Sequence, residues 1–229
     1  MLCARRLARL EPVAALLKDT YNVDVRTFSL DVTDSNEIRN AMEALPAEWR
    51  QIDVLINNAG KALGRATFHE GDLEDMDGML HANVRGLIHV SRSVIPGMVA
   101  RGQGHVINIG SVAGKWTYPS GSVYCATKAA VAALSEGMKM DLHGTGVRVS
   151  SVDPGLVETE FSLVRFHGDE EEAAKVYANI APLTAADVAD VVVFCATRPA
   201  HVNLNQIVMM CTDQSSSTMV FRHPARQES

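Results

Sequence analysis

The sequence lacks a long apolar run. No segment approaches the roughly 20 apolar residues that a helix needs to cross a bilayer. The first residues, Met1 to Arg6, contain no extended apolar region of the secretory kind. We therefore expect a protein that neither spans a membrane nor carries a secretory signal.

Cysteine is scarce, and excess positive charge is absent. The four cysteines, at positions 3, 125, 195 and 211, match no zinc-binding spacing, and the eight histidines form no ligand cluster. We expect no metal, reduced thiols that act as small apolar side chains, and a cytoplasmic location. The formal net charge of -6 gives no global basic field to hold nucleic acid, although local basic patches remain possible.

What the sequence does contain is a repeated alternation of short apolar runs and longer helical patterns. Its 229 residues, 47% of them hydrophobic, suit a single domain spanning 1–229. The predicted strands cover residues 23–30, 52–56, 105–109, 147–152 and 206–210, and we expect 52–56 to be buried. The predicted helices cover residues 38–45, 79–99 with an interruption near Pro96, 123–142, and a stretch from the cap at 184 to about 197. This alternation predicts an α/β fold with a doubly wound parallel sheet, where ligands bind beyond the carboxyl ends of the strands.

Two helix starts carry capping signals, and one segment looks loosely held. Asp34 with Glu37 three residues later resembles a capping box. Thr184, with Asp187 in the first turn, indicates the start of the last helix. The serine run 215–217 in the tail after Asp213, and the last few residues, are expected to be loose.

The candidate chemistry lies around residues 111–128. Tyr124 and Lys128 are four residues apart on a predicted helix, a spacing that places both side chains on one face. A tyrosine hydroxyl has a pKa of about 10, and an ammonium group one turn away favours the phenolate. Tyr124 can then exchange a proton with a carbonyl or alcohol oxygen, which Ser111 can hold by a hydrogen bond. Taken alone, the pair fits equally an ordinary helix with a core tyrosine and a solvated lysine.

The surrounding motifs strengthen the catalytic interpretation. They are Ala4-Arg5-Arg6, Asp31-Val32, Asn57-Asn58-Ala59-Gly60, Asn83, Ile109-Gly110-Ser111, Tyr124-Cys125-Ala126-Thr127-Lys128 and Asp153-Pro154-Gly155-Leu156-Val157. Together they resemble the short-chain dehydrogenase/reductase family from Arg5 to near the C-terminus. Residues 154–169, 199–205 and 45–49 resemble more closely its NADP-dependent 3-hydroxy acid dehydrogenase subgroup, which includes serine and L-allo-threonine dehydrogenases and malonic semialdehyde reductases.

The resemblance implies a Rossmann-like fold and a role for each matching residue. Tyr124 would be the proton donor or acceptor, and Lys128 would lower its pKa and bind the nicotinamide ribose. Ser111 would position the substrate carbonyl, and Asn83 would hold a water that links Lys128 to solvent. The residues implied to line the rest of the cofactor cleft are Asp31, Val32, Asn58, Gly60, Pro154, Gly155, Val157 and Thr159. The resemblance also implies a homo-oligomer, a dimer or a homotetramer.

The choice between NAD and NADP depends on the residues that face the adenosine ribose. An acidic residue there binds the free hydroxyls, whereas arginine binds a 2′-phosphate by charge-assisted hydrogen bonds. The matching position holds Arg5 and Arg6 and no acid, which predicts NADP. The alternative is a solvated basic helix start, since Arg9 is also nearby.

The glycine-rich turn of the family is missing from this sequence. The first strand, that turn and the first helix would precede Arg5, a gap of roughly one βα unit, about 30 residues. We expect the sheet to lose ladder partners there, and the chain itself to bind NADPH weakly. A start codon assigned too far downstream and a chain that exists in this length are both open explanations.

The subgroup implies small 3-hydroxy acids or the corresponding 3-oxo acids and semialdehydes as substrates. Arg165 is our candidate for the substrate carboxylate, with a surface ion pair to Asp169 or Glu170 as the alternative. Trp116 and Tyr118 either wall the pocket or pack in the core. The rival functions are reduction of 3-oxoacyl, sugar or steroid carbonyls, and a non-catalytic subunit that acts only through oligomerisation.

Overall fold

The computed structural model of the chain describes residues 1–224 and contains two parallel sheets. The smaller sheet pairs β1 (Leu2–Ala4) with β2 (Thr27–Ser29). The larger has the order β3-β4-β5-β6 and consists of β3 (Val54–Asn57), β4 (Gly104–Ile109), β5 (Val147–Pro154) and β6 (Gln206–Met209). No helix among the described residues is long and apolar enough to cross a membrane.

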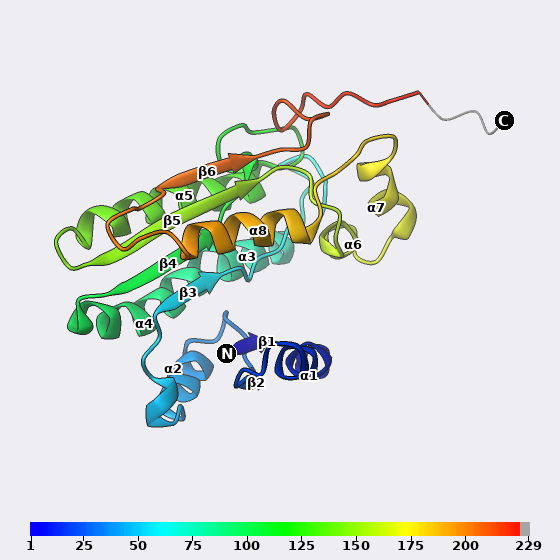
Figure 1. Cartoon of the computed structure of the whole chain (residues 1–229). Coiled ribbons are helices and arrows are strands. Elements are labelled where there is room, and N and C mark those ends of the chain that lie inside the picture. Colours follow the sequence, from blue (N-terminus) through cyan, green and yellow to red (C-terminus); the bar gives the residue numbers. More distant parts are fainter. Residues whose placement is uncertain (225–229) are drawn as a thin grey trace.

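Helices cover both faces of the larger sheet (Figure 1). On one face lie α3 (Leu73–Leu80), α4 (Leu87–Arg101) and α5 (Ser122–Asp141), and on the other lies α8 (Ala185–Ala196). The remaining helices are α1 (Leu10–Tyr21), α2 (Ser35–Glu43), α6 (Phe161–Arg165) and α7 (Glu170–Tyr177), and short 3-10 turns occupy Leu7–Arg9, Ala47–Trp49 and Val112–Gly114. The predicted doubly wound parallel architecture is therefore confirmed.

The core lies against the two central strands. β4 and β5 pair on both edges, and their apolar side chains pack against α4 on one face and α8 on the other. The first cluster contains Val94, Met98, Val106, Leu142, Val147 and Val149, and the second contains Ile107, Val152, Val192 and Cys195. The covered strands also bury polar side chains, which make hydrogen bonds such as those between His105 and Ser150 and between Asn108 and Ser135. This packing holds the carboxyl ends of β4 and β5 in fixed register beneath the candidate site.

The sheet is interrupted between β1 and β3, where the resemblance implies a further strand. Neither strand pairs with the other, and β3 has only β4 as a neighbour. As a result Val54 and Ile56 are 40% and 48% exposed, so the prediction that this strand is buried is wrong. An apolar strand with one unpaired edge exposes ladder groups as well as side chains to solvent.

Other local predictions also differ from the structure. Pro96 lies inside α4 and does not interrupt it, because Val94 and Met98 anchor the surrounding turns in the core. Asp34 caps α2 as predicted, accepting from the backbone N–H of Asn36 and Glu37. The carboxylate of Glu37 instead accepts from the N–H of Asp31, so there is no capping box. Thr184 and Asp187 do form one.

The tail up to residue 224 is held by hydrogen bonds, contrary to prediction. The N–H of Ser215 donates to the carbonyl of Met219 at 2.9 Å, and the N–H of Phe221 donates to that of Asp213 at 2.8 Å. Gln214 is 5% exposed, and its amide oxygen accepts from the N–H of Leu156 at 2.8 Å. The first two bonds hold the tail to itself, and the bond between Gln214 and Leu156 ties it to the loop after β5. The last few residues lie outside the described part of the chain.

His105 in β4 should make the fold sensitive to mild acid. It is 1% exposed and hydrogen-bonded to the Ser150 hydroxyl at 2.8 Å. Burial, assisted by the charge of Arg148, lowers its pKa from 6.5 to about 4. The folded state therefore favours the neutral imidazole. The stability that this preference contributes is fully present above pH 6.5 and is lost as pH falls from 6.5 toward 4. Between pH 7 and pH 5 the loss should be about 2 kcal/mol.

Urea unfolding of the wild type and of His105→Gln at both pH values tests this expectation. The variant should be less stable at pH 7, because it loses core packing, but its free energy of unfolding should fall less between pH 7 and pH 5. Parallel losses in the two proteins would show that other groups cause the acid sensitivity.

Candidate active site

Tyr124 and Lys128 lie together beside the carboxyl ends of β4 and β5. Both project from the first turns of α5, with exposed fractions of 8% and 7%. The Lys128 ammonium is 6.0 Å from the centre of the Tyr124 ring. The alternative of a solvated lysine is therefore wrong, because the chain buries both groups in one place.

Lys128 is held by a backbone carbonyl and faces a buried acid. Its Nζ donates to the carbonyl of Ile109 at 2.9 Å. Burial lowers the pKa of Lys128 to about 8, and the charge of Asp153 partly opposes this shift. The Asp153 carboxylate is 1% exposed and accepts hydrogen bonds from Ser151 and Gln206. Asp153 is thus part of the electrostatic environment of the lysine.

Burial also has the largest effect on the pKa of Tyr124. Desolvation raises its pKa, with a smaller upward effect from Tyr118, whereas Ser111 and Arg165 act in the downward direction. The net direction is opposite to the lowering predicted from Lys128, because the loss of water around the hydroxyl outweighs nearby positive charge. The hydroxyl consequently stays protonated in this structure, which suits a proton donor.

Ser111 and Asn83 complete the predicted catalytic group. Ser111 begins the turn after β4, and its hydroxyl accepts from the N–H of Ala113 at 3.1 Å. Asn83 lies in a π-helical segment, His81–Gly86, between α3 and α4. Its amide nitrogen donates to the Lys61 carbonyl at 2.8 Å and to the Thr127 hydroxyl at 3.0 Å, and its oxygen accepts from the N–H of Lys61 at 2.8 Å. Asn83 therefore fixes the loop after β3 against α5, whereas its water-holding role stays a prediction.

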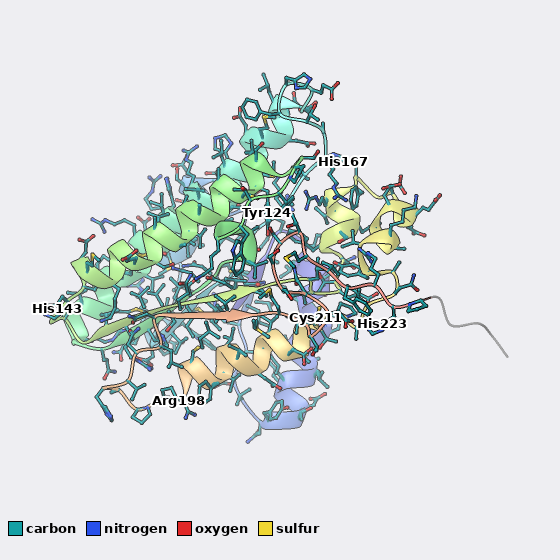
Figure 2. The ribbon with its side chains drawn as sticks, turned by 90° about the horizontal axis from the view of Figure 1, so that it is seen from above. Tyr124, His143, His167, Arg198, Cys211 and His223 are labelled. Carbon is teal, nitrogen blue, oxygen red and sulfur yellow. The ribbon has the colours of Figure 1, made fainter. Side chains whose placement is uncertain are left out.

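Arg165 reaches the same region from the end of α6. Its guanidinium carbon is 6.0 Å from the centre of the Tyr124 ring and 5.4 Å from that of Tyr118. Its Nη1 donates to the Tyr118 hydroxyl at 3.0 Å. Among the described ion pairs it contacts neither Asp169 nor Glu170, so the surface alternative is not the arrangement seen. His167, which follows Arg165 by two residues, lies at the same end of the molecule as Tyr124, whereas His143 lies at the other end (Figure 2).

A cavity of about 210 Å³ adjoins Tyr124 and Arg165. Its apolar walls include Leu63, Phe68, Met76 and Met79, and its polar lining includes Asp72 and Asp75. Tyr118 packs in the core beside the site, whereas Trp116 is 40% exposed and is absent from the cavity lining. Glu70 adds a third carboxylate to this lining, and Arg165 is the cationic residue among the residues that line the cavity.

The predicted cofactor residues follow the ends of four strands. Arg5 and Arg6 come after β1, Asp31 and Val32 after β2, and Asn58 and Gly60 after β3, whereas Pro154 ends β5 and Gly155, Val157 and Thr159 follow it. A second cavity, of about 300 Å³, is lined by Arg5, Asp31, Thr33, Lys61, Gly78, His81 and Arg85. Lys61 and Arg85 thus join Arg5 there, and sequence reasoning did not single them out.

Two of these positions hold glycines that lie close to a neighbouring side chain. A Cβ at Gly60 would lie 3.2 Å from Oδ1 of Asn83 and 3.7 Å from Nζ of Lys128. A Cβ at Gly155 would collide with Oε1 of Gln214, so any other residue there requires the Gln214 side chain to move. These glycines let the Asn83 and Gln214 side chains pack closely against the loops after β3 and β5.

Arg6 and its neighbour Arg9 contact the loop after β5. Glu160 accepts from Arg9 at 2.5 Å and from Arg6 at 3.4 Å. Hydrogen bonding and charge from Arg9 lower the pKa of Glu160. Sequence reasoning took Arg9 only as a sign of a basic surface and missed Glu160, because the two are 151 residues apart. Asp153 was also missed as a site residue, although its Asp-Pro-Gly context after a predicted strand could have identified it.

Comparisons with known proteins agree with this geometry. The family model for short chain dehydrogenases matches residues 1–169. The NADP-dependent 3-hydroxy acid dehydrogenase YdfG of Salmonella typhi is 52% identical over 200 residues, which cover 87% of this chain and 81% of that protein. The NADP-dependent 3-hydroxy acid dehydrogenase of Schizosaccharomyces pombe is 41% identical over 225 residues, which cover 98% of this chain and 87% of that protein.

Among solved structures, the closed form of serine dehydrogenase complexed with NADP+ matches with a TM-score of 0.89 and 45% identity, and covers 97% of this chain and 88% of that chain. The family model covers well over half of the sequence, and both curated relatives exceed 40% identity across most of their length. The chain therefore belongs to the short-chain dehydrogenase family.

Proposed function

We propose that the protein is an NADP-dependent oxidoreductase that interconverts small 3-hydroxy acids and the corresponding 3-oxo acids or semialdehydes. The observation that carries the proposal is the burial of Tyr124 and Lys128 beside a cavity that Arg165 also lines. An enzyme maintains a buried ammonium group at a cost in stability, whereas a subunit that acts only through oligomerisation has no need of one. The names of the relatives support the substrate class and the cofactor.

The residues present fit NADP. Lys128 offers an ammonium group beside Tyr124, Arg5 and Arg6 offer cations at the end of β1, and Arg5 lines one cavity together with Lys61 and Arg85. NADP, when bound, supplies or accepts the hydride. Asp31, Val32, Asn58, Val157 and Thr159 are the further residues that we assign to its binding.

The chain's own groups then handle the proton and the carboxylate. In reduction, the Tyr124 hydroxyl donates its proton to the substrate carbonyl oxygen while the Ser111 hydroxyl hydrogen-bonds the same oxygen. The Lys128 ammonium stabilises the phenolate that remains. In oxidation, the proton moves in the opposite direction. The Arg165 guanidinium holds the substrate carboxylate and so orients the 3-position toward Tyr124.

A substrate panel followed by NADPH absorbance tests the proposal, with Arg165→Met as the diagnostic variant. The variant should raise KM for a 3-hydroxy acid by roughly 50-fold, because a charge-assisted hydrogen bond is lost. For an uncharged 3-hydroxy amide of the same size, KM should change little. Equal effects on both compounds would remove Arg165 from the site. Preferred turnover of an acyl thioester, sugar or steroid would indicate one of the other carbonyl reductases.

Glu160 should compete with the cofactor phosphate for the arginines. Because Glu160 already contacts Arg6 and Arg9, Glu160→Gln should weaken both ion pairs and leave Arg6 free for the 2′-phosphate. We expect NADPH to bind about threefold more tightly to the variant, with NADH unchanged. Fluorescence titration of each cofactor provides the measurement. Weaker NADPH binding by the variant would instead mean that the acid helps to hold the arginines in place.

A cytoplasmic location and a homo-oligomeric assembly belong to the same proposal. The four cysteines are free, which supports a reducing, cytoplasmic environment. Large apolar side chains are exposed on the outer faces of three helices, which supports a homotetramer or dimer. They are Ile88 and Val99 on α4, Met140 on α5, and Val193 and Phe194 on α8. Light scattering of the purified chain gives the oligomeric state directly.

A further inference from the structure

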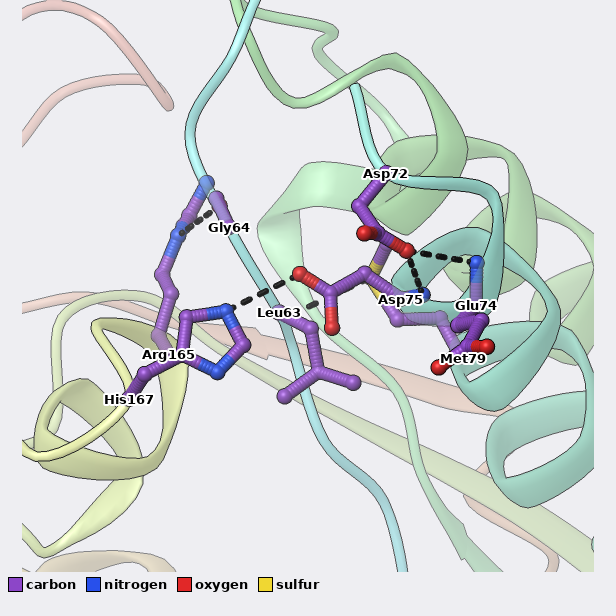
Figure 3. Close-up of polar contacts among 8 residues, drawn as sticks. All are labelled: Leu63, Gly64, Asp72, Glu74, Asp75, Met79, Arg165 and His167. Atoms are coloured by element: carbon purple, nitrogen blue, oxygen red, sulfur yellow. Dashed lines mark hydrogen bonds and ion pairs between the residues drawn. The ribbon is translucent and has the colours of Figure 1, made fainter.

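The segment that carries Arg165 is fastened to the loop after β3 and to the start of α3. The backbone N–H of Gly64 donates to the carbonyl of Arg165 at 2.9 Å. In return, Nε of Arg165 donates to the carbonyl of Gly64 at 3.3 Å. Two residues further on, Nε2 of His167 lies 2.9 Å from Oδ2 of Asp75. Figure 3 shows these contacts side by side.

The local backbone aims His167 at Asp75. His167 has a left-handed conformation with φ 53°, and Gly168 follows with φ 92°. The N–H of Gly168 donates to the carbonyl of Leu163 at 2.8 Å, so the chain folds back at the end of α6. Non-glycine residues adopt positive φ only at an energetic cost. The N–H of His167 also donates to the carbonyl of Val164 at 3.2 Å, so this is a Schellman-type helix end with His167 in its left-handed position, from which the imidazole extends toward α3.

Asp75 is held in position for this contact by the first turn of α3. Asp72 caps α3 and accepts from the N–H groups of Glu74 and Asp75, which fixes the first turn of that helix. The Asp75 side chain is then free to extend toward His167, and it is 21% exposed. A Cβ at Gly64, where φ is +65°, would lie 3.2 Å from Oδ2 of Asp75. A Cβ there would crowd the carboxylate, and the positive φ also favours glycine at this position.

We propose that His167 and Asp75 form a clasp that positions Arg165 over the substrate cavity. We define the clasp as the His167–Asp75 pair, which closes the turn at the end of α6. Arg165 lies just before this turn, where it contacts Tyr118 and faces Tyr124. His167 and Asp75 are positioning residues, since they act on the substrate carboxylate only through Arg165. The inference rests on the proposed function of Arg165 and assigns to the clasp a part in recognising acidic substrates.

The first test measures the clasp without any catalysis. An arginine-specific protease cuts after Arg165 only when the segment opens. His167→Ala and Asp75→Asn should each raise the rate of this cut by about fivefold, the scale of a partly exposed ion pair. His167→Lys should restore the wild-type rate, since its ammonium group can donate a hydrogen bond to Asp75 in place of the imidazole. His143→Ala, an exposed histidine in the turn after α5, is the matched control and should leave the rate unchanged.

The second test connects the clasp to substrate recognition. His167→Ala should raise KM for the 3-hydroxy acid by about fivefold, with kcat unchanged to within about twofold. His167→Lys should return KM to the wild-type value, whereas a merely structural defect would not respond to a restored hydrogen-bond donor to Asp75. KM for the uncharged amide should stay constant in all of these variants.

The two tests separate failure of the clasp from failure of the proposed function. If the protease cuts wild type and His167→Ala at the same rate, the clasp does not hold the segment and the inference is overturned. If the cut accelerates and is rescued by lysine while Arg165→Met has no acid-specific effect, the clasp exists but the substrate role of Arg165 is wrong. If His167→Lys fails to rescue either readout, the ion pair is not the cause.

Discussion

Replacing Tyr124 with phenylalanine should lower kcat by about 10³-fold while leaving the fold intact. General acid–base catalysis by a positioned side chain contributes typically 10²–10⁴-fold, and the hydroxyl is the only group removed. The ring stays in place, because its packing against Phe161, at a centroid distance of 5.8 Å, does not involve the hydroxyl. The residual rate should come from orientation by Ser111 and Arg165.

Tyr118→Phe is the matched control for this prediction. Tyr118 lies beside Tyr124 but contacts Arg165 through its hydroxyl, so its loss should affect KM for the acid more than kcat. Both variants are to be compared by steady-state kinetics and by thermal unfolding. A Tyr124→Phe protein with more than about a tenth of the wild-type kcat would remove the phenol from the chemical step.

Lys128→Met should produce the second large loss, on the order of 10²–10³-fold in kcat/KM. The ammonium is a positive charge 6.0 Å from the Tyr124 ring centre and is itself buried. Without it, the phenolate that remains after proton donation loses the cation that stabilises it. Methionine preserves the length and apolar contacts of the side chain, so the expected loss reflects charge.

The Lys128→Met substitution should leave the stability of the fold unchanged or raise it, although it lowers activity. Folding lowers the pKa of Lys128 from 10.5 to about 8, so carrying the ammonium into the fold at pH 7 costs roughly 3 kcal/mol. The variant avoids this cost but loses the bond to Ile109 and leaves Asp153 without its neighbouring cation. We expect the free energy of unfolding at pH 7 to be unchanged or higher by up to about 2 kcal/mol.

The pH dependence gives this prediction a definite sign. A lysine with a depressed pKa contributes stability that grows as pH rises from about 8 toward 10.5. Wild type should therefore gain stability over that interval, and Lys128→Met should not. Lys139→Met on the same helix is the matched control. A strongly destabilised Lys128→Met protein at pH 7 would show that the ammonium is mainly structural.

Much of the architecture follows from the sequence because it depends on local pattern. The strands at β3 to β6 and the helices α2, α5 and α8 are evident from apolar runs, the cap at Asp34 and the capping box at Thr184. The spacing of Tyr124 and Lys128 places them on one helix face in any helix. The motifs around these two residues are sufficient to identify the family, because they are short and contiguous in the chain.

The differences occur where contacts between distant residues decide the outcome. Pro96 does not interrupt α4, because core packing by its neighbours outweighs the local signal. The exposed Val54 and Ile56 reflect an unpaired strand edge, which an apolar run does not reveal. The raised pKa of Tyr124 follows from desolvation, which local charge alone did not anticipate.

The amino-acid order by itself determined the family and the alternation of strands and helices, and it predicted the reacting groups, since each of these depends on residue type and short-range spacing. Only the tertiary structure decided that Asp153 faces Lys128, that Glu160 meets Arg9, and that His167 reaches Asp75. The last two pairs join side chains separated by 151 and 92 positions. Electrostatic interactions act over a few ångströms in space, so the folded chain must first bring such groups together.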